Sequence, residues 1–233
     1  MKDRNTKIKQ AAQAGFTIVE LMIATLVFST ILLVITFGVI HFTSDYYKGV
    51  NSSTTQDTAR NIMNIMSQAI QFSGDTPLNP TPSSVCIGNQ QLVYTLGNEI
   101  LTASDNGLAQ ITDTSCDSAA VASSGTELLD TRMRLVQFSV TEPMSGGVPV
   151  FSDHSVWKVT VSIAYGDNDL LCDSSVAASA TGGCSSHANP IADPNTATAA
   201  SNGTLHCKSM TGSQFCDVVT LSTTVTRRIV GAG

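Results

Sequence analysis

The chain has 233 residues, 13% of them charged, and a formal net charge of −6. This length fits one globular head with an anchor better than two globular domains. Outside the first residues, the chain lacks the clustered lysines and arginines that neutralise phosphates, so direct binding of nucleic acid is not expected.

Basic residues gather at the start of the chain. Residues 1–15 carry Lys2, Arg4, Lys7 and Lys9 against Asp3. The rest of the chain has eight basic and seventeen acidic residues, a net charge of −9. A basic segment before an apolar helix predicts that the N-terminus stays in the cytoplasm and that the remainder is exported.

A long apolar stretch follows, from Gly15 to Phe42. Leu21 to Ile40 alone gives twenty consecutive uncharged residues, about the length that a helix needs to cross a hydrocarbon core of ~30 Å. Glu20 is the exception, because a carboxylate at membrane depth costs on the order of 3 kcal/mol. It is therefore expected to have a partner and a function.

Three simpler interpretations of this stretch compete. A cleaved secretory signal would have a shorter apolar core and a small-residue cleavage site after it. A plain membrane anchor fits the length but gives no reason for Glu20 or for the Gly15-Phe16 pair. A buried helix of a soluble protein would not run for twenty residues without a charge.

The order of residues favours a fourth interpretation. A short basic leader ends in Gly15, the aromatic Phe16 follows, and Glu20 is the fifth residue after the glycine, at the head of the apolar run. Over roughly the first thirty residues this pattern resembles the N-terminus of type IV prepilins and of type II secretion pseudopilins.

The resemblance implies a role for three residues. Prepilin peptidase would cleave after Gly15, and the new N-terminus, Phe16, would be N-methylated. In such proteins the glutamate is thought to pair with the N-terminal amine of a neighbouring subunit, and Glu20 would take this part in assembly. The expected partners are the peptidase, other pilin subunits, the pilus assembly machinery and the inner membrane.

The helix is expected to continue beyond the membrane, from Phe16 to Phe72, and to stop at Ser73-Gly74-Asp75. Its second half is amphipathic, with an apolar stripe formed by Ala59, Ile62, Met63, Met66, Ala69 and Ile70. A break near Gly49 into two helices is the alternative. The expected parts are a leader (1–15), an assembly helix (16–44), an amphipathic helix (45–74) and a β-rich head (75–233).

Beyond residue 75 the apolar residues recur with period two, as in strands. Gly97-Asn98 predicts a tight hairpin between Leu92–Leu96 and Glu99–Thr102. The further strands expected are Leu108–Thr112, Arg132–Val140 (covered on both faces), Val156–Tyr165 and Asp217–Arg227. Together they predict an antiparallel sheet of four or more strands, one face of which the helix covers.

Six cysteines follow the apolar helix, and an even number in an exported region predicts disulfides. Six cysteines allow fifteen connectivities. The pairs that close short loops are Cys86–Cys116, Cys172–Cys184 and Cys207–Cys216. The Ser-, Ala- and Thr-rich segment 166–206 is interpreted as a surface loop held by a disulfide. It is either a binding loop or an insertion without a function.

Three further patterns suggest sites, each with a simpler explanation. Cys184-x-x-His187 with His206-Cys207 has zinc-ligand residue types, but disulfides explain the cysteines better. Asp167-Asn168-Asp169, near Asp173, offers oxygen ligands for calcium but lacks a full ligand loop, and a solvated turn is the simpler explanation. Asp153-His154-Ser155 has hydrolase residue types without a nucleophile elbow, and a histidine in a loop is the simpler explanation.

A tryptophan and a pair of arginines have structural explanations. Trp157 is expected in the core. Arg227-Arg228 could touch a neighbouring subunit, although paired surface charges are commonly inert. No cofactor, no metal and no catalytic residue is expected.

The expected fold class is α+β and pilin-like: a long N-terminal helix, half membrane-spanning and half amphipathic, packed on an antiparallel β-sheet head with disulfide-pinned loops. The resemblance implies a structural subunit, a minor pilin of a type IV pilus, held in the bacterial inner membrane as a precursor and then assembled into a filament. The alternatives are a pseudopilin of a type II secretion system, a membrane-anchored adhesin or binding module, and an anchored enzyme.

Overall fold

The computed structural model describes residues 16–72, 78–81, 83–112, 122–145, 147–151, 155–167, 170–173, 205–207 and 212–228. The expected leader, 1–15, lies outside these residues. The chain divides into two compact units, residues 1–44 and residues 45–233.

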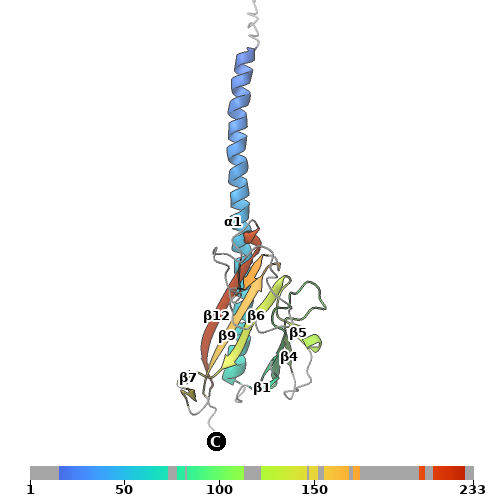
Figure 1. The fold of residues 1–233 in the computed structure, drawn as a ribbon, viewed down its shortest axis with the longest axis vertical. Coiled ribbons are helices and arrows are strands. Elements are labelled where there is room, and N and C mark those ends of the chain that lie inside the picture. The colour runs from blue at the N-terminus through green and yellow to red at the C-terminus, as the bar shows by residue number, and fades with distance from the viewer. Residues whose placement is uncertain are drawn as a thin grey trace, which may run out of the picture. The chain divides into compact units, whose positions relative to one another are not determined.

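Helix α1 runs without interruption from Ile18 to Phe72, a length of 55 residues (Figure 1). The alternative of two helices broken near Gly49 is wrong. A single glycine in a helix costs only about 1 kcal/mol relative to alanine, and α1 contains no proline. The prediction of one long helix is therefore confirmed.

The second half of α1 buries one face. The buried residues are Thr55, Thr58, Ala59, Ile62, Met63, Met66, Ala69 and Ile70. All six residues of the predicted apolar stripe are among them, which confirms the amphipathic interpretation. The stripe is a core element of the head, and each fully buried large aliphatic side chain contributes about 1.5–3 kcal/mol.

One antiparallel sheet has five strands in the order β1-β2-β3-β4-β5. Its strands are β1 (Leu78–Thr81), β2 (Ser84–Ile87), β3 (Gln90–Tyr94), β4 (Leu108–Thr112) and β5 (Thr126–Glu127). The predicted strand Leu108–Thr112 is confirmed as β4, whereas β2 was not predicted. The 3₁₀ turn η1 (Ala122–Ser124) precedes β5.

The predicted hairpin around Gly97-Asn98 is wrong. Gly97 does turn the chain, with φ 78°, but β3 pairs with β2 and β4 instead of residues 99–102. The backbone after the turn bonds to the start of β6 (Met133–Thr141). The Gly97 N–H donates to Leu135 O (2.8 Å), and the Ile100 N–H donates to Met133 O (3.0 Å). Tertiary pairing thus overrides the local hairpin signal.

A second antiparallel sheet has three strands in the order β12-β9-β6, with β9 in the middle (Figure 1). β9 (Val156–Tyr165) and β12 (Asp217–Thr226) pair over ten residues, from Asp217↔Tyr165 to Thr226↔Val156. The three predicted strands are confirmed within a residue or two. The strands form this sheet and the five-stranded one rather than a single sheet.

Strand β6 is covered on both faces, as predicted, whereas Ser222 and Thr224 of β12 are exposed on the face away from α1. On one face a core cluster joins the α1 stripe to residues of both sheets, and Trp157 is buried there as expected. On the other face, Val136 and Ala164 pack with Leu170, Leu171, Leu205 and Cys216. The segments around β10 and β11 therefore cover one end of the sheet on the face opposite α1.

Two short ribbons complete the described head. β7 (Met144–Ser145) pairs with β8 (Val148–Pro149). β10 (Leu171–Asp173) pairs with β11 (Leu205–Cys207), which brings together the two ends of the Ser-, Ala- and Thr-rich segment. The 3₁₀ turn η2 (Ser213–Phe215) leads into β12.

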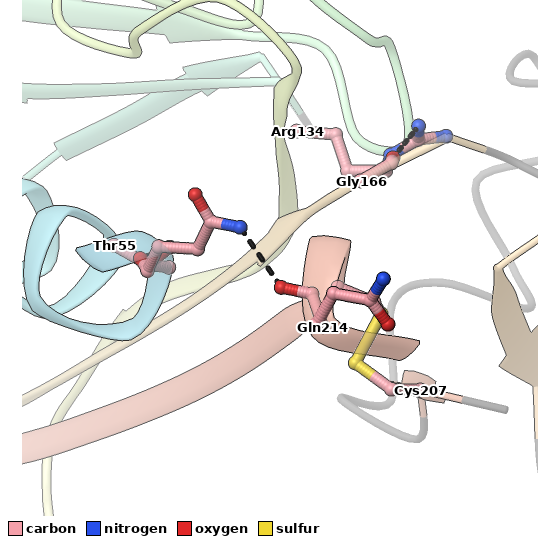
Figure 2. Close-up of a disulfide and its surroundings, with 7 residues drawn as sticks. Thr55, Arg134, Gly166, Cys207 and Gln214 are labelled. Atoms are coloured by element: carbon pink, nitrogen blue, oxygen red, sulfur yellow. Dashed lines mark hydrogen bonds between the residues drawn. A yellow bond between two sulfur atoms is a disulfide. The ribbon is translucent and has the colours of Figure 1, made fainter. Parts of the chain in front are cut away.

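A disulfide joins Cys207 to Cys216, as predicted (Figure 2). Cys86 is also disulfide-bonded. The predicted pairs Cys86–Cys116 and Cys172–Cys184 involve Cys116, Cys184 and the Cys172 side chain, which lie outside the described residues. These two pairings stay predictions.

Candidate functional site

The first turn of α1 holds the residues that the sequence singled out. Thr17 precedes the helix, and Oε2 of Glu20 accepts hydrogen bonds from the Thr17 backbone N–H (2.9 Å) and hydroxyl (3.0 Å). In return, the Glu20 backbone N–H donates to the Thr17 hydroxyl oxygen (3.2 Å). This reciprocal arrangement is a capping box, which satisfies two backbone donors that a helix start otherwise leaves open.

The capping box gives Glu20 a partner in its own chain. From the sequence, the expected partner of Glu20 is the amine that cleavage creates at Phe16, and Thr17 was not predicted. The signal was present, because a threonine three residues before a glutamate at the start of an apolar run is the capping-box pattern. Both described bonds end on Oε2, and a carboxylate has about four acceptor sites, so Glu20 can still accept a further donor.

The apolar part of α1 follows directly. Every residue from Phe16 to Thr43 is exposed in the described chain, and this part is long and apolar enough to cross a membrane. Its hydroxyl groups are satisfied within the helix. Ser29 donates to Thr25 O (2.6 Å) and Thr36 to Leu32 O (2.7 Å). The helix therefore presents a continuous apolar surface that lipid or other helices can cover.

Gly15 lies outside the described residues, so the structure does not test cleavage after it. Phe16 is 86% exposed at the start of the described chain. Its methylation, and the pairing of Glu20 with an amine, stay predictions.

The zinc hypothesis loses one of its ligands. The Cys207 sulfur is bonded to Cys216, so it is not a thiolate ligand. Cys184 and His187 lie outside the described residues. In the part of the chain that the structure describes, no three His, Cys, Asp or Glu side chains come close enough to hold a metal ion.

The calcium and hydrolase patterns fall largely outside the described residues. Asp167 is described, and its carboxylate lies 3.6 Å from the Arg132 guanidinium in an exposed ion pair. Asn168, Asp169 and the Asp173 side chain are not described. Asp153 and His154 of the hydrolase pattern are not described either.

The paired arginines lie beside the last turn of α1. The Arg227 backbone N–H donates to Ser155 O (2.7 Å) and the Arg228 N–H to Gln71 O (3.3 Å). The Arg228 guanidinium lies over the Phe72 ring, 5.3 Å from its centre. This cation–π contact places a positive charge near the helix C-terminus, where the helix dipole favours one.

A buried ion pair fixes the base of the Ser-, Ala- and Thr-rich segment. Arg134 Nη2 lies 2.7 Å from Glu99 Oε2 and donates to Gly166 O at 2.7 Å (Figure 2). Burial lowers the pKa of Arg134, and the charge of Glu99 opposes this shift. Glu99 and Arg134 are far apart in sequence, and no local pattern connects them.

These features define a class of protein: an α+β chain with a capped N-terminal helix, apolar enough in its first half to cross a membrane, and a disulfide-containing β-rich head. Comparison with protein families is more specific. Residues 10–36 match the prokaryotic N-terminal methylation motif, the type IV prepilin-type signature. No curated protein and no solved structure matches the chain.

The motif spans Gly15, Phe16 and Glu20. It supports a processed subunit of the type IV pilin or pseudopilin kind, anchored in the membrane as a precursor. It also implies, in general terms, processing by prepilin peptidase and handling by a pilin assembly machinery.

Proposed function

We propose that this chain is a structural subunit of a type IV pilus, a minor pilin, and not an enzyme. Prepilin peptidase cleaves after Gly15, Phe16 is N-methylated, and the subunit waits in the inner membrane with its N-terminus in the cytoplasm. The observation that carries the proposal is the methylation motif on an exposed apolar helix that begins with Glu20 in a capping box.

The capping box suggests how the subunit is stored. Before assembly, the Glu20 carboxylate is satisfied by Thr17, which lowers the cost of a lone acid near the membrane. After cleavage, the Phe16 amine of a neighbouring subunit supplies a charged donor. The amine carries a full positive charge, and its attraction to the carboxylate in a medium of low dielectric exceeds that of the uncharged Thr17 donors, so the new pair favours the filament and sets the axial register.

The experiment compares Glu20→Ala with a matched control on the same helix. Ser29→Ala removes a hydroxyl that bonds only within α1 among the described contacts, and it should be cleaved and assembled like the wild type. Glu20→Ala should be cleaved but excluded from sheared filaments. Normal incorporation of Glu20→Ala would refute the proposed role of the carboxylate.

Intact-mass analysis of the protein from membranes tests the processing itself. The expected mass is that of a chain that begins at Phe16, carries one methyl group and has its six cysteines oxidised. Recovery of the chain with residues 1–15 attached, from cells with working filaments, would overturn the proposal.

The same helix would serve a pseudopilin of a type II secretion system equally well. The two differ in the machine that recruits the subunit. Deletion of the pilus assembly ATPase and, separately, of the secretion ATPase distinguishes them by which deletion removes the protein from sheared filaments.

One observation favours a second function, an anchored binding module. A groove of about 390 Å³ lies in the head between α1 and the five-stranded sheet. Its lining combines four side-chain amides with three aliphatic side chains and one aromatic ring, from Ile65, Gln68, Ala69, Phe72, Ile87, Asn89, Gln90 and Gln110. Amides both donate and accept hydrogen bonds, so the groove fits a neutral, hydroxyl-rich ligand such as a glycan.

This second function makes a separate prediction. Full-length protein in micelles should bind glycans on an array, and Gln90→Ala with Gln110→Ala should reduce the signal at least tenfold while Glu20→Ala leaves it unchanged. If the wild-type protein gives no more glycan signal than the double variant, the binding-module function is refuted.

A further inference from the structure

Aromatic residues form an exposed patch on the head unit near its first residues. Tyr46 and Tyr47 lie on α1, Phe215 lies at the end of η2, and their exposed fractions are 61%, 45% and 40%. The Tyr47 and Phe215 ring centres are 5.5 Å apart, and those of Tyr46 and Tyr47 are 6.1 Å apart. With the exposed Val50, these residues are called the aromatic patch.

Phe215 is held in this position by several contacts. Its backbone N–H donates to Gly212 O (2.9 Å), and Cys216 is tied to Cys207 by the disulfide. Asn51 Nδ2, about one helix turn after Tyr47, donates to Gln214 O at 3.0 Å, and Figure 2 shows the bond that ends on Gln214. Defined contacts therefore hold the patch together, although it is formed by two segments far apart in sequence.

The position of the patch in the chain indicates what covers it. Charged residues are absent from Leu21 to Ser44 and resume at Asp45, so Tyr46 and Tyr47 come directly after the apolar span. Tyrosine and tryptophan are enriched where a membrane-spanning helix leaves the hydrocarbon core, because their rings are apolar and their tips are polar. The two tyrosines fit this interface by position and by chemistry.

Phe215 extends the same chemistry to a different segment. It comes from the β-rich part of the head, and nothing about membrane insertion of α1 requires an exposed ring there. Yet the disulfide and the Asn51 contact hold that ring against Tyr47. An exposed aromatic ring held beside two interfacial tyrosines gains free energy if it enters the same layer of the bilayer.

We propose that the aromatic patch binds the headgroup and glycerol layer of the phospholipid bilayer while the subunit is stored in the membrane. Phe215 then inserts beside Tyr46 and Tyr47 and holds the head on the membrane surface. The inference rests on the membrane anchoring of the proposed function and adds a second lipid contact, made by the head itself.

The charges in these segments indicate the kind of lipid contact. In the described segments 45–52 and 212–217 the charged residues are Asp45, Lys48 and Asp217. Acids outnumber bases, so attraction to anionic lipid is not the driving force. Binding should depend on burial of the aromatic rings and should occur equally with zwitterionic phosphatidylcholine.

The test uses the full-length protein, one copy per phosphatidylcholine nanodisc, with bromine on the upper acyl carbons as a quencher of tryptophan fluorescence. The variant Phe215→Trp places a fluorescent tryptophan in the aromatic patch. Phe151→Trp is the matched control, because the exposed fraction of Phe151, 43%, is similar to the 40% of Phe215. Phe151 lies shortly before β9 in the sequence, near the end of that strand that begins at Val156. Phe215 lies shortly before Asp217, which pairs with Tyr165 at the other end of β9. The length of β9, about 30 Å, therefore separates the two positions.

Bromolipid should quench the added emission of Phe215→Trp at least twofold more than that of Phe151→Trp. The buried Trp157 provides the same background in both variants and in the wild type. Equal quenching in the two variants would overturn the proposal. Quenching that appears only with two copies per disc would also overturn it, since the patch would then be a contact between copies.

A second measurement needs no substitution. Phosphatidylcholine with a photoactivatable group near the glycerol should label wild-type peptides that contain residues 46–47 and residues 212–216, and should leave residues 144–151 unlabelled. Labelling of residues 46–47 without residues 212–216 would contradict the role of Phe215. Failure of the chain to co-purify with the disc would instead contradict the anchoring, so the two failures are distinguishable.

Discussion

The Arg134 guanidinium lies 2.7 Å from the Glu99 carboxylate, with side-chain exposures of 1% and 12%. Arg134 also donates to Gly166 O, so this one side chain connects the turn after β3, the start of β6 and the end of β9. A buried charge pair is costly to break, because the remaining partner is left without compensation in a medium of low dielectric.

Removing Glu99 should therefore weaken the head strongly. Glu99→Ala leaves the Arg134 charge buried without its carboxylate, and we expect a loss of about 3–5 kcal/mol in the free energy of unfolding. Asp167→Ala breaks an exposed pair with Arg132, at 3.6 Å, and should cost less than about 1 kcal/mol. Chemical unfolding of the full-length protein in micelles measures both, and equal losses would contradict the argument.

The capping box predicts a local effect at the start of α1. Thr17→Val keeps the shape of the side chain but removes the hydroxyl that accepts from the Glu20 N–H, at an expected cost of about 1 kcal/mol for the first turn. Amide hydrogen exchange should become several-fold faster at residues 18–21. Thr17→Ser retains the hydroxyl and should exchange like the wild type; if it exchanges like Thr17→Val, the hydroxyl does not cap the helix.

Two glycines give opposite predictions for the same substitution. Gly166 has φ +120°, and an added Cβ would lie 2.8 Å from Phe215 O, so Gly166→Ala should destabilise the head by about 1–3 kcal/mol. Gly49 is inside α1 with no atom within 4 Å of an added Cβ. Gly49→Ala should therefore stabilise the helix by about 0.5–1 kcal/mol. Thermal unfolding of the two variants checks the signs.

Asp217 predicts a pH dependence. Burial raises the pKa of its carboxyl, and the Ser52 hydroxyl, the Val218 N–H and Lys48 oppose the shift. Because the folded-state pKa is raised, ionisation disfavours the fold at pH values above it, and this cost disappears as the pH falls below the ordinary aspartate value of about 4. Stability from this group thus rises on acidification.

Asp217→Asn removes the charge at every pH and retains an oxygen that can accept from Ser52. At pH 7 the variant should be more stable than the wild type by a few tenths of a kcal/mol, since solvent screens a half-buried charge. The difference should shrink as the pH approaches 4. Melting temperatures from pH 4 to 7 measure it, and a difference that grows on acidification would show that the sign is wrong.

Much of the fold was predictable from periodicity. The α1 stripe has helical spacing, and β9 and β12 are rich in β-branched residues, so local pattern and tertiary structure agree there. The Cys207–Cys216 disulfide closes a short loop, which made that pair easy to propose.

The errors arise where distant segments decide the outcome. The turn at Gly97 has the residues of a hairpin, but the amides that follow bond to β6. The Glu99–Arg134 pair joins residues that sequence alone does not connect. The capping box at the candidate site is a local pattern, so it could have been predicted. Threonine and glutamate three residues apart, at Thr17 and Glu20, are its signature.

The order β12-β9-β6 also has a consequence for biogenesis. The middle strand of this sheet receives one of its two neighbours from residues 217–226, which follow every other described strand in the sequence. In the proposed export across the inner membrane, β6 can pair with β9 at once, but the β9 backbone groups on the other edge stay unpaired until those residues arrive. Final closure of the sheet therefore waits on late translocation, and a chaperone that shields an open strand edge would act in that interval.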